Sequence, residues 1–202
     1  MRIVAIDASP GRGVVSLSVE AVARSAEAAG ATVQRIRLST LELRACTGCG
    51  MCRYTGACKI TDDLPLIAEQ IENADGVIFG LPSYFLHPDS ATQAVLDRIT
   101  RFFPENRQLT LPGLGHRDVP QAPHVRAARR AVIITACKAP EPLATFFGYT
   151  NGPIRELRRA LGSGGIKTVG SLALTGGWMR DSFDEWERDK ATSLGRMLAG
   201  RI

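Results

Sequence analysis

Short runs of apolar, often β-branched residues alternate along the chain with longer segments whose apolar residues recur at helical spacing. This alternation predicts five strands and five helices, and it favours a parallel sheet covered by helices on both faces. The expected strands are 3–6, 32–38, 76–79, 131–135 and 167–174, and the expected helices are 16–28, 62–73, 89–103, 151–161 and 184–198.

Two of these strands, at 77–79 and 132–134, are apolar without interruption. Continuous apolar runs are typical of strands that are buried on both faces, as in a doubly wound sheet. Such sheets bind their ligands beyond the carboxyl ends of the strands. The loops after the first, third and fourth strands are therefore the places where we expect chemistry.

Composition narrows the class of protein. With 202 residues and 45% hydrophobic content, the chain suits one globular domain, 1–202. The net charge of +5 is mild and spread out, so it does not indicate nucleic-acid binding. We expect no membrane span and no signal peptide, hence a cytoplasmic protein with reduced thiols. Residues 104–130 hold four prolines without periodicity, which predicts an irregular insertion acting as a lid, a flap or a dimer contact.

The loop after the first strand is made of small residues and leads into a helix. Such a loop lets backbone wrap an anion, whose charge the helix N-terminus favours. Ser9, Ser16 and Ser18 offer hydroxyl donors, and Arg12 offers a cation. The segment matches neither a dinucleotide-binding fingerprint nor a Walker loop. The alternatives are a phosphate site and an ordinary glycine-containing turn with Ser16 as helix cap.

The loop after the third strand, residues 80–85, combines a rigid turn with an aromatic pair. Pro82 restricts the backbone, Ser83 offers a hydroxyl, and Tyr84 with Phe85 offers a flat surface for a planar ring. The competing interpretation is that the two aromatic side chains cover the core.

Four of the five cysteines lie within thirteen residues, in a cysteine loop that we define as residues 45–60. Glycines between them allow tight winding, so several thiolates can turn inward. This arrangement suits a cuboidal iron–sulfur cluster, whereas structural zinc more often uses two separated Cys-x2-Cys pairs. Free or redox-active thiols are the third interpretation. The candidate metal ligands are Cys46, Cys49, Cys52 and Cys58.

Several motifs together resemble the NAD(P)H-dependent FMN reductase superfamily, and within it the iron–sulfur flavoproteins. They are 8–10 (Ala-Ser-Pro), the cysteines of 46–58, 61–64 (Thr-Asp-Asp-Leu), 80–85, and 97–98 (Asp-Arg), in that order. The resemblance implies a flavodoxin-like fold, a three-layer doubly wound five-stranded parallel sheet of order 2-1-3-4-5.

The same resemblance implies FMN, with its phosphate at Ser9, Arg12, Ser16 and Ser18 and its ring against 82–85. It also implies a [4Fe-4S] cluster on the four clustered cysteines. Ala136 and Cys137 stand where the family contacts the pyrimidine edge of the flavin, although a buried thiol is the preferred interpretation of Cys137. The loop departs from the family at Ala8 and Val15, where glycine and asparagine are usual.

The leading hypothesis is therefore an FMN-dependent oxidoreductase that moves electrons between NAD(P)H or a ferredoxin-like donor and a small-molecule or protein acceptor. One alternative is a cluster-free reductase of FMN, quinones or nitro compounds, and another is a non-catalytic flavin or thiol redox sensor. The resemblance suggests a homodimer or homotetramer. We expect the cysteine loop to lie close to the flavin, and Asp97 and Arg98 to form structural ion pairs.

Overall fold

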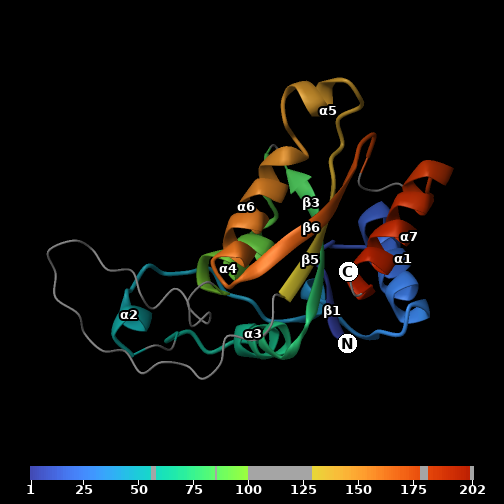
Figure 1. The fold of residues 1–202 in the computed structure, drawn as a ribbon. Coiled ribbons are helices and arrows are strands. Elements are labelled where there is room, and N and C mark those ends of the chain that lie inside the picture. Colours follow the sequence, from blue (N-terminus) through green and yellow to red (C-terminus); the bar gives the residue numbers. More distant parts are fainter. Residues whose placement is uncertain (56–57, 85, 100–128, 178–181, 201–202) are drawn as a thin grey trace, which may run out of the picture.

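A five-stranded parallel sheet forms the centre of the computed structural model, which describes residues 1–55, 58–84, 86–99, 129–177 and 182–200 (Figure 1). Its order is β2-β1-β3-β5-β6, and every neighbouring pair on this path is parallel. In chain order these strands give the predicted 2-1-3-4-5, so the flavodoxin-like arrangement is confirmed. The strands are β1 (Arg2–Asp7), β2 (Thr32–Arg37), β3 (Gly76–Tyr84), β5 (Arg129–Ala136) and β6 (Ile166–Leu174).

Helices cover both faces of the sheet (Figure 1). On one face lie α1 (Val14–Ala28) and α7 (Glu185–Ala199), and on the other lie α3 (Leu64–Asn73), α4 (Ser90–Ile99) and α6 (Asn151–Gly162). These are the five predicted helices, with ends shifted by a few residues. Four short elements were not predicted, because a few residues are too short to show a period. They are η1 (Leu38–Thr40), α2 (Met51–Thr55), β4 (His87–Pro88) and α5 (Leu143–Phe146).

The central strands feed two separate cores because successive side chains point to opposite faces. In β3, Val77 and Phe79 pack with α3, α4 and α6, whereas Ile78 packs with α1 and α7. In β5, Ile133 and Ile134 divide in the same way. This two-sided burial explains why both runs are apolar throughout.

One close approach fixes α1 against the end of β3. A Cβ atom on Gly80 would lie 2.2 Å from Cγ2 of Val19, so only glycine fits there without movement. The carbonyl of Gly80 also accepts a hydrogen bond of 2.8 Å from the backbone N–H of Ala8. The carboxyl end of β3 and the loop after β1 are thereby held together.

The predicted insertion at 104–130 falls mostly outside the described residues. Its last two residues, Arg129 and Arg130, belong to β5 instead, where they pair with β6. Their side chains are half-buried at the start of the strand and donate to backbone carbonyls, which explains how a strand begins on two arginines. The expected helix at 89–103 is α4, described as far as Ile99.

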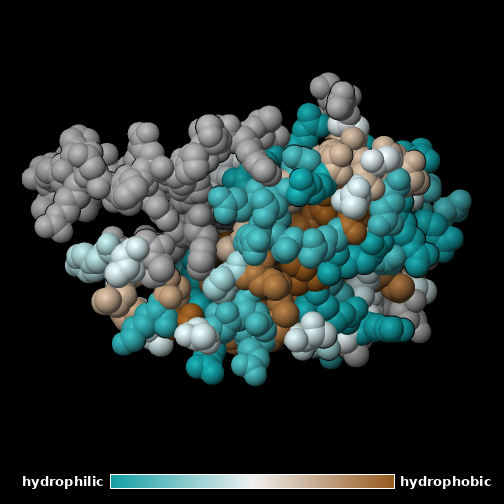
Figure 2. Space-filling model, turned by 90° about the horizontal axis from the view of Figure 1, so that it is seen from below, coloured by the Kyte–Doolittle hydropathy of each residue, from teal (hydrophilic) through white to brown (hydrophobic). Residues whose placement is uncertain are grey.

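Among the described helices none combines the length and apolar character that a membrane crossing requires. Seen from below, the described surface is mostly hydrophilic, with apolar atoms showing near the centre of that face (Figure 2). The opposite end carries α5, which projects beyond the sheet (Figure 1); its last residue, Phe146, and the following Phe147 are exposed.

Candidate functional site

Two loops that the sequence marked for chemistry meet at the carboxyl edge of the sheet. Asp7, the last residue of β1, lies opposite Gly80 in β3, and β3 continues from there to Tyr84. Residues 80–84, which were predicted as part of a loop, are therefore strand and extend past the end of β1. The β1–α1 loop, residues 8–13, then leads into α1 at Val14. The first turn of a helix leaves backbone N–H groups without partners in the helix, and these face the same loop.

A hydrogen-bond network joins two of the predicted serines in the β1–α1 region. The Oγ atoms of Ser9 and Ser16 lie 2.8 Å apart. Both hydroxyls also donate to the carboxylate of Asp7, Ser16 at 2.7 Å. The structure therefore brings Ser9 and Ser16 together as a pair of hydroxyls at one point.

Asp7 was missed by sequence reasoning, although it is the centre of this network. It is 7% exposed, accepts the N–H of Ser9 at 2.9 Å, and pairs with the guanidinium of Arg37 at 3.0 Å. An acidic residue directly after a buried strand is the signal that could have found it, since aspartate is seldom buried without a partner. Arg37, at the end of β2, balances its charge.

The other two residues predicted for this loop do not join the network of Ser9, Ser16 and Asp7. Ser18 is fully buried, and its hydroxyl donates to the carbonyl of Val14 at 2.7 Å within α1. It is therefore not brought to the loop. Arg12 is exposed on the loop, where its cation is accessible to an anion from solvent.

A strand-edge cavity of about 490 Å³ lies between the β1–α1 loop and the chain after β3. This volume is in the range of small-molecule sites. Its lining includes Tyr84, and the pKa of this phenol is raised by burial and by the nearby carboxylate of Asp89. The lining residues are Ala8, Pro10, Ser39, Tyr84, Pro88, Asp89, Ser90 and Ala91; Ser39, Asp89 and Ser90 among them were not predicted.

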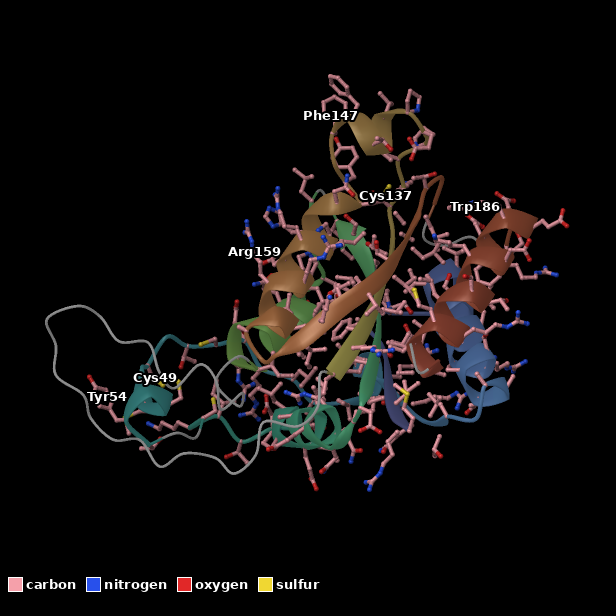
Figure 3. All side chains as sticks on the ribbon, viewed as in Figure 1. Cys49, Tyr54, Cys137, Phe147, Arg159 and Trp186 are labelled. Carbon is pink, nitrogen blue, oxygen red and sulfur yellow. The ribbon has the colours of Figure 1, made fainter. Side chains whose placement is uncertain are left out.

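The remaining described residues that were predicted around a planar ring do not line this cavity. Pro82 and Ser83 are buried, and Ser83 donates its hydroxyl to the carbonyl of Tyr149. Ala136 lies opposite Pro82 in the next strand. Cys137 is 2% exposed, and burial raises the pKa of its thiol (Figure 3). Phe85, which was predicted to contact the same ring, lies outside the described residues.

The cysteine loop leaves the sheet as extended chain and carries the short helix α2 (Figures 1 and 3). Gly48 and Gly50 have φ values of 67° and 71°, the left-handed region in which glycine is favoured. These turns provide the tight winding expected of the loop. Cys46 and Cys49 are exposed, whereas Cys52 and Cys58 are half-buried.

All four cysteines of this loop line one cysteine cavity of about 230 Å³, together with Lys59, Asp97 and Arg98. The pKa of the Cys49 thiol is lowered by the backbone N–H of Met51, the side chain of Thr47 and the charge of Lys59. A lowered pKa favours the thiolate, which is the form that binds metals.

The donor set of this cavity fits an iron–sulfur cluster in chemistry and number. Four thiols line it, and the buried Nε of Arg98 has no hydrogen-bond partner among the described residues. The sulfurs are not preassembled, however: across the described ranges no three Cys, His, Asp or Glu side chains stand in a metal-binding arrangement. The cysteine cavity thus contains four thiols that could bind a cluster, but their sulfur atoms do not converge on one point.

The two cavities share no lining residue, and α4 connects them. Ser90 and Ala91 at its start line the strand-edge cavity, while Asp97 and Arg98 near its end line the cysteine cavity. At 1.5 Å per residue, Ala91 and Arg98 are about 10 Å apart along the helix. The cysteine loop is therefore near the strand-edge cavity but does not line it.

Comparison with known proteins agrees with the resemblance found in the sequence. The family model described as NADPH-dependent FMN reductase matches residues 1–112. The chain is 27% identical over 200 residues to an iron-sulfur flavoprotein of Archaeoglobus fulgidus, covering 98% of this chain and 79% of that protein. It is 33% identical over 99 residues to an iron-sulfur flavoprotein of Methanocaldococcus jannaschii, which is 48% of this chain and about half (51%) of that relative.

Solved structures share the fold at low identity. An NAD(P)H:quinone oxidoreductase from Methanothermobacter marburgensis superposes with a TM-score of 0.70 at 19% identity, covering 100% of this chain and 98% of that one. A flavone reductase superposes with a TM-score of 0.71 at 14% identity, covering 98% of this chain and 62% of that one, so this chain spans less than two thirds of its length.

Proposed function

Because the chain belongs to the NADPH-dependent FMN reductase family, we propose that it is an FMN oxidoreductase that carries a [4Fe-4S] cluster and passes electrons between NAD(P)H or a ferredoxin-like donor and an acceptor. The observation that carries the cluster is that all four cysteines of the loop line one cavity at the end of α4. The two curated relatives described above are both named iron-sulfur flavoproteins, which supports this choice.

The flavin phosphate belongs at the β1–α1 loop. Ser9 and Ser16 would donate their hydroxyls, Arg12 would supply charge, and the first turn of α1 would present its free N–H groups. In the structure the two hydroxyls donate to Asp7, so they must turn toward the phosphate when it binds. Arg37 keeps the Asp7 carboxylate paired and so limits its repulsion of the phosphate. Ser18 is left out of this proposal because its hydroxyl is buried inside α1.

The ring belongs in the strand-edge cavity, where Tyr84 supplies an aromatic surface. The Tyr84 phenol is protonated at neutral pH, as tyrosine ordinarily is, and its raised pKa extends this form further into the alkaline range, so it can donate a hydrogen bond to an acceptor atom on the ring. Pro82, Ser83, Phe85, Ala136 and Cys137 remain proposed neighbours of the ring. FMN, when bound, supplies the exchange between electron pairs and single electrons, and these side chains bind and orient it.

Cys46, Cys49, Cys52 and Cys58 would hold the cluster, one thiolate at each iron. A four-cysteine cluster supplies single-electron transfer, with a potential set by hydrogen bonds and solvent exposure. No described acid or base has to act in the transfer itself. The roughly 10 Å of α4 between the two cavities lets one chain hold both groups apart and still near each other.

We also propose that residues 1–202 form a single domain and that the protein works as a homo-oligomer. Its compartment would be a reducing one, such as the cytosol. The five cysteines are all free, which suits a reducing compartment. Phe146 is 82% exposed and packs edge-on against Phe147, and an exposed aromatic pair is a common feature of subunit interfaces.

A cluster-free FMN, quinone or nitro reductase is the second candidate. It is favoured by the absence, among described residues, of three side chains already arranged for a metal. The third, a non-catalytic redox sensor, differs from both because it would not turn over.

Anaerobic rapid mixing with NADPH or NADH separates these candidates. The proposed function predicts bleaching of the flavin absorbance followed by loss of the iron–sulfur absorbance, and turnover with ferricyanide or a quinone. Flavin bleaching with turnover but no second phase would indicate the cluster-free reductase. Bleaching without turnover on any acceptor would indicate a sensor. No bleaching with either nucleotide, but reduction by a reduced ferredoxin, would assign the donor to a protein.

A further inference from the structure

A buried arginine beside the cysteine cavity has no part in the function proposed so far. Arg98 lies in the last turn of α4 and is 3% exposed. A guanidinium is costly to bury, so it requires charged and hydrogen-bonded partners. Those partners come from both ends of the cysteine loop.

The guanidinium of Arg98 connects the chain before Cys46 with the chain after Cys58. It forms a two-pronged ion pair with Asp62, whose side chain is fully buried, with Nη2 at 2.9 Å from Oδ1. Its Nη1 also donates to the carbonyl of Arg44 at 2.9 Å. One side chain from α4 thereby holds both ends of the loop.

The carboxylate of Asp62 completes this connection. It accepts the backbone N–H of Arg44 at 2.9 Å and that of Leu64 at 3.3 Å. Next to it, Asp63 and Glu42 exchange two hydrogen bonds, of 2.8 and 3.0 Å. The loop is therefore anchored where it starts and ends. Because its two ends are already held together, the loop has less conformational entropy to lose when a ligand binds to it.

The same guanidinium brings positive charge to the sulfurs. Arg98 lines the cavity with all four cysteines of the loop. Hydrogen bonds with Asp62 and then with Cys58 raise the pKa of Arg98. Its Nε–H is buried and has no hydrogen-bond partner among the residues described, so at least one donor remains uncommitted at this site.

We propose that Arg98 is a positioning residue of the cysteine site, which holds the two ends of the cysteine loop together and places a permanent positive charge beside Cys58. The part of this inference that concerns redox potential rests on the proposed cluster, whereas the part that concerns the loop does not. Arginine suits the task because it stays charged at every physiological pH and binds a carboxylate through two parallel hydrogen bonds.

The charge has a consequence for electron transfer. Reduction of the cluster adds one electron and one negative charge at the sulfurs and irons. A fixed cation nearby stabilises the reduced form more than the oxidised form, so it raises the reduction potential. Removal of the cation must lower the potential.

Two variants and a matched control test both parts. Arg98→Lys keeps the charge but loses the two-pronged pairing. The double variant Asp62→Asn/Arg98→Gln removes both charges and leaves no unpaired buried ion. Arg98 lines the cysteine cavity and Asp62 does not, so the loss of the nearer positive charge should dominate at the sulfurs. Arg159→Gln removes an exposed arginine from α6, away from the cysteine cavity (Figure 3), and controls for the loss of an arginine elsewhere on the surface. Flavin content per chain reports whether each variant is folded.

Hydrogen exchange measured by mass spectrometry tests the loop. We expect the amides of Arg44 and Leu64 to exchange at least about tenfold faster in both Arg98 variants than in the wild type or Arg159→Gln, because both variants lose the two-pronged pairing that holds side chain 62, the acceptor of these amides. Wild-type exchange at these amides in both variants would overturn the proposal.

A dithionite titration of the anaerobic protein, followed by electron paramagnetic resonance, tests the charge. We expect the cluster potential of the double variant to shift below that of the wild type, and those of Arg98→Lys and Arg159→Gln to stay near it. An unshifted double variant would overturn the proposal. If the wild type holds no iron, the proposed cluster fails, and the exchange experiment alone decides the role of Arg98 in the loop. If only the double variant loses iron, its potential cannot be measured and its amide exchange decides. Faster exchange of the Arg44 and Leu64 amides with flavin retained would then support the role of Arg98 in holding the loop, and wild-type exchange of these amides would overturn it.

Discussion

The strand-edge cavity is made of strand ends and the start of a helix, whereas the cysteine cavity is made of a loop with one short helix. Beside the first, Ser9 and Ser16 are already joined to Asp7 and to each other, although neither lines the cavity. In the second, the four cysteines share a cavity but do not converge, and only the ends of the loop are anchored. At the first site the fold already holds the two serine side chains together, and only their hydroxyls must turn toward a phosphate, whereas the second site needs its ligand to bring the cysteines together. Coupling of metal binding to local folding is the general behaviour of sites of the second kind.

The largest expected effect comes from Cys49→Ala. Loss of one thiolate should abolish the iron and sulfide of the anaerobically purified protein, because the loop has no spare donor in the described part of the cavity. FMN should remain near the wild-type amount. The matched control is Cys137→Ala, which removes a buried thiol outside the cavity and should leave the iron in place. Joint loss of iron and flavin in Cys49→Ala would contradict two separate sites.

Ser16→Ala addresses the other site. Loss of a hydroxyl that donates to a phosphate should raise the Kd for FMN by roughly 10- to 100-fold, since a hydrogen bond to a charged group contributes about 1.5–3 kcal/mol. Riboflavin, which lacks the phosphate, should bind equally to both proteins. Ser18→Ala is the control, because its hydroxyl bonds inside α1. Fluorescence titration checks the effect, and equal weakening by both variants would place the phosphate elsewhere.

Acid should open the anchored ends of the cysteine loop. Burial raises the pKa of Asp62, but the hydrogen bonds from Arg98 and from the N–H groups of Arg44 and Leu64 outweigh it, so the net pKa is lowered. A lowered carboxyl pKa stabilises the fold above the unfolded value of about 3.9, and this stability is lost as the pH falls through the folded value.

Denaturant unfolding at a series of pH values from about 6 down to about 3 measures this loss. The free energy of unfolding of the wild type should fall through the acid range. Asp62→Asn should show a shallower fall, because residue 62 can no longer take up a proton. An equally steep fall in Asp62→Asn would assign the acid sensitivity to other carboxyls.

Arg35→Ala should have the smallest effect. Arg35 in β2 pairs with Glu20 and Glu27 of α1 at 2.8 and 2.7 Å, and their hydrogen bonds to it lower the pKa values of both carboxyls. All three side chains are about 40% exposed, so we expect a loss below about 1 kcal/mol that shrinks further in high salt. Denaturant unfolding at two salt concentrations checks this, and a loss of several kcal/mol would show that α1 depends on these pairs.

The strand–helix alternation was readable in the sequence because each main element shows a clear period and buries its apolar face. The short elements α2 and β4 were not, since so few residues show no period. Asp7 stands out in the sequence only as an acidic residue after a buried strand, and its partners Arg37 and Ser16 could be named only once β1, β2 and α1 are together. The sequence pointed to ion pairs for Asp97 and Arg98, and Arg98 does form one, but its partner Asp62 lies 36 residues away and could not be named without the fold.

For the cysteines, too, the sequence predicted the kind of chemistry but not the position of the site in the fold. Their spacing indicated metal or redox chemistry, and glycine turns at 48 and 50 follow the expectation of tight winding. Their distance from the strand edge could not be read, because it depends on where α4 lies. The structure places them at the far end of that helix from Ala91.

Quantification of FMN, iron and acid-labile sulfide per chain in the anaerobically purified wild type tests the central claim most directly. Two cavities at the ends of α4 predict one FMN together with about four irons and four sulfides per chain. Flavin with neither iron nor sulfide, or zinc in place of iron, would contradict the claim.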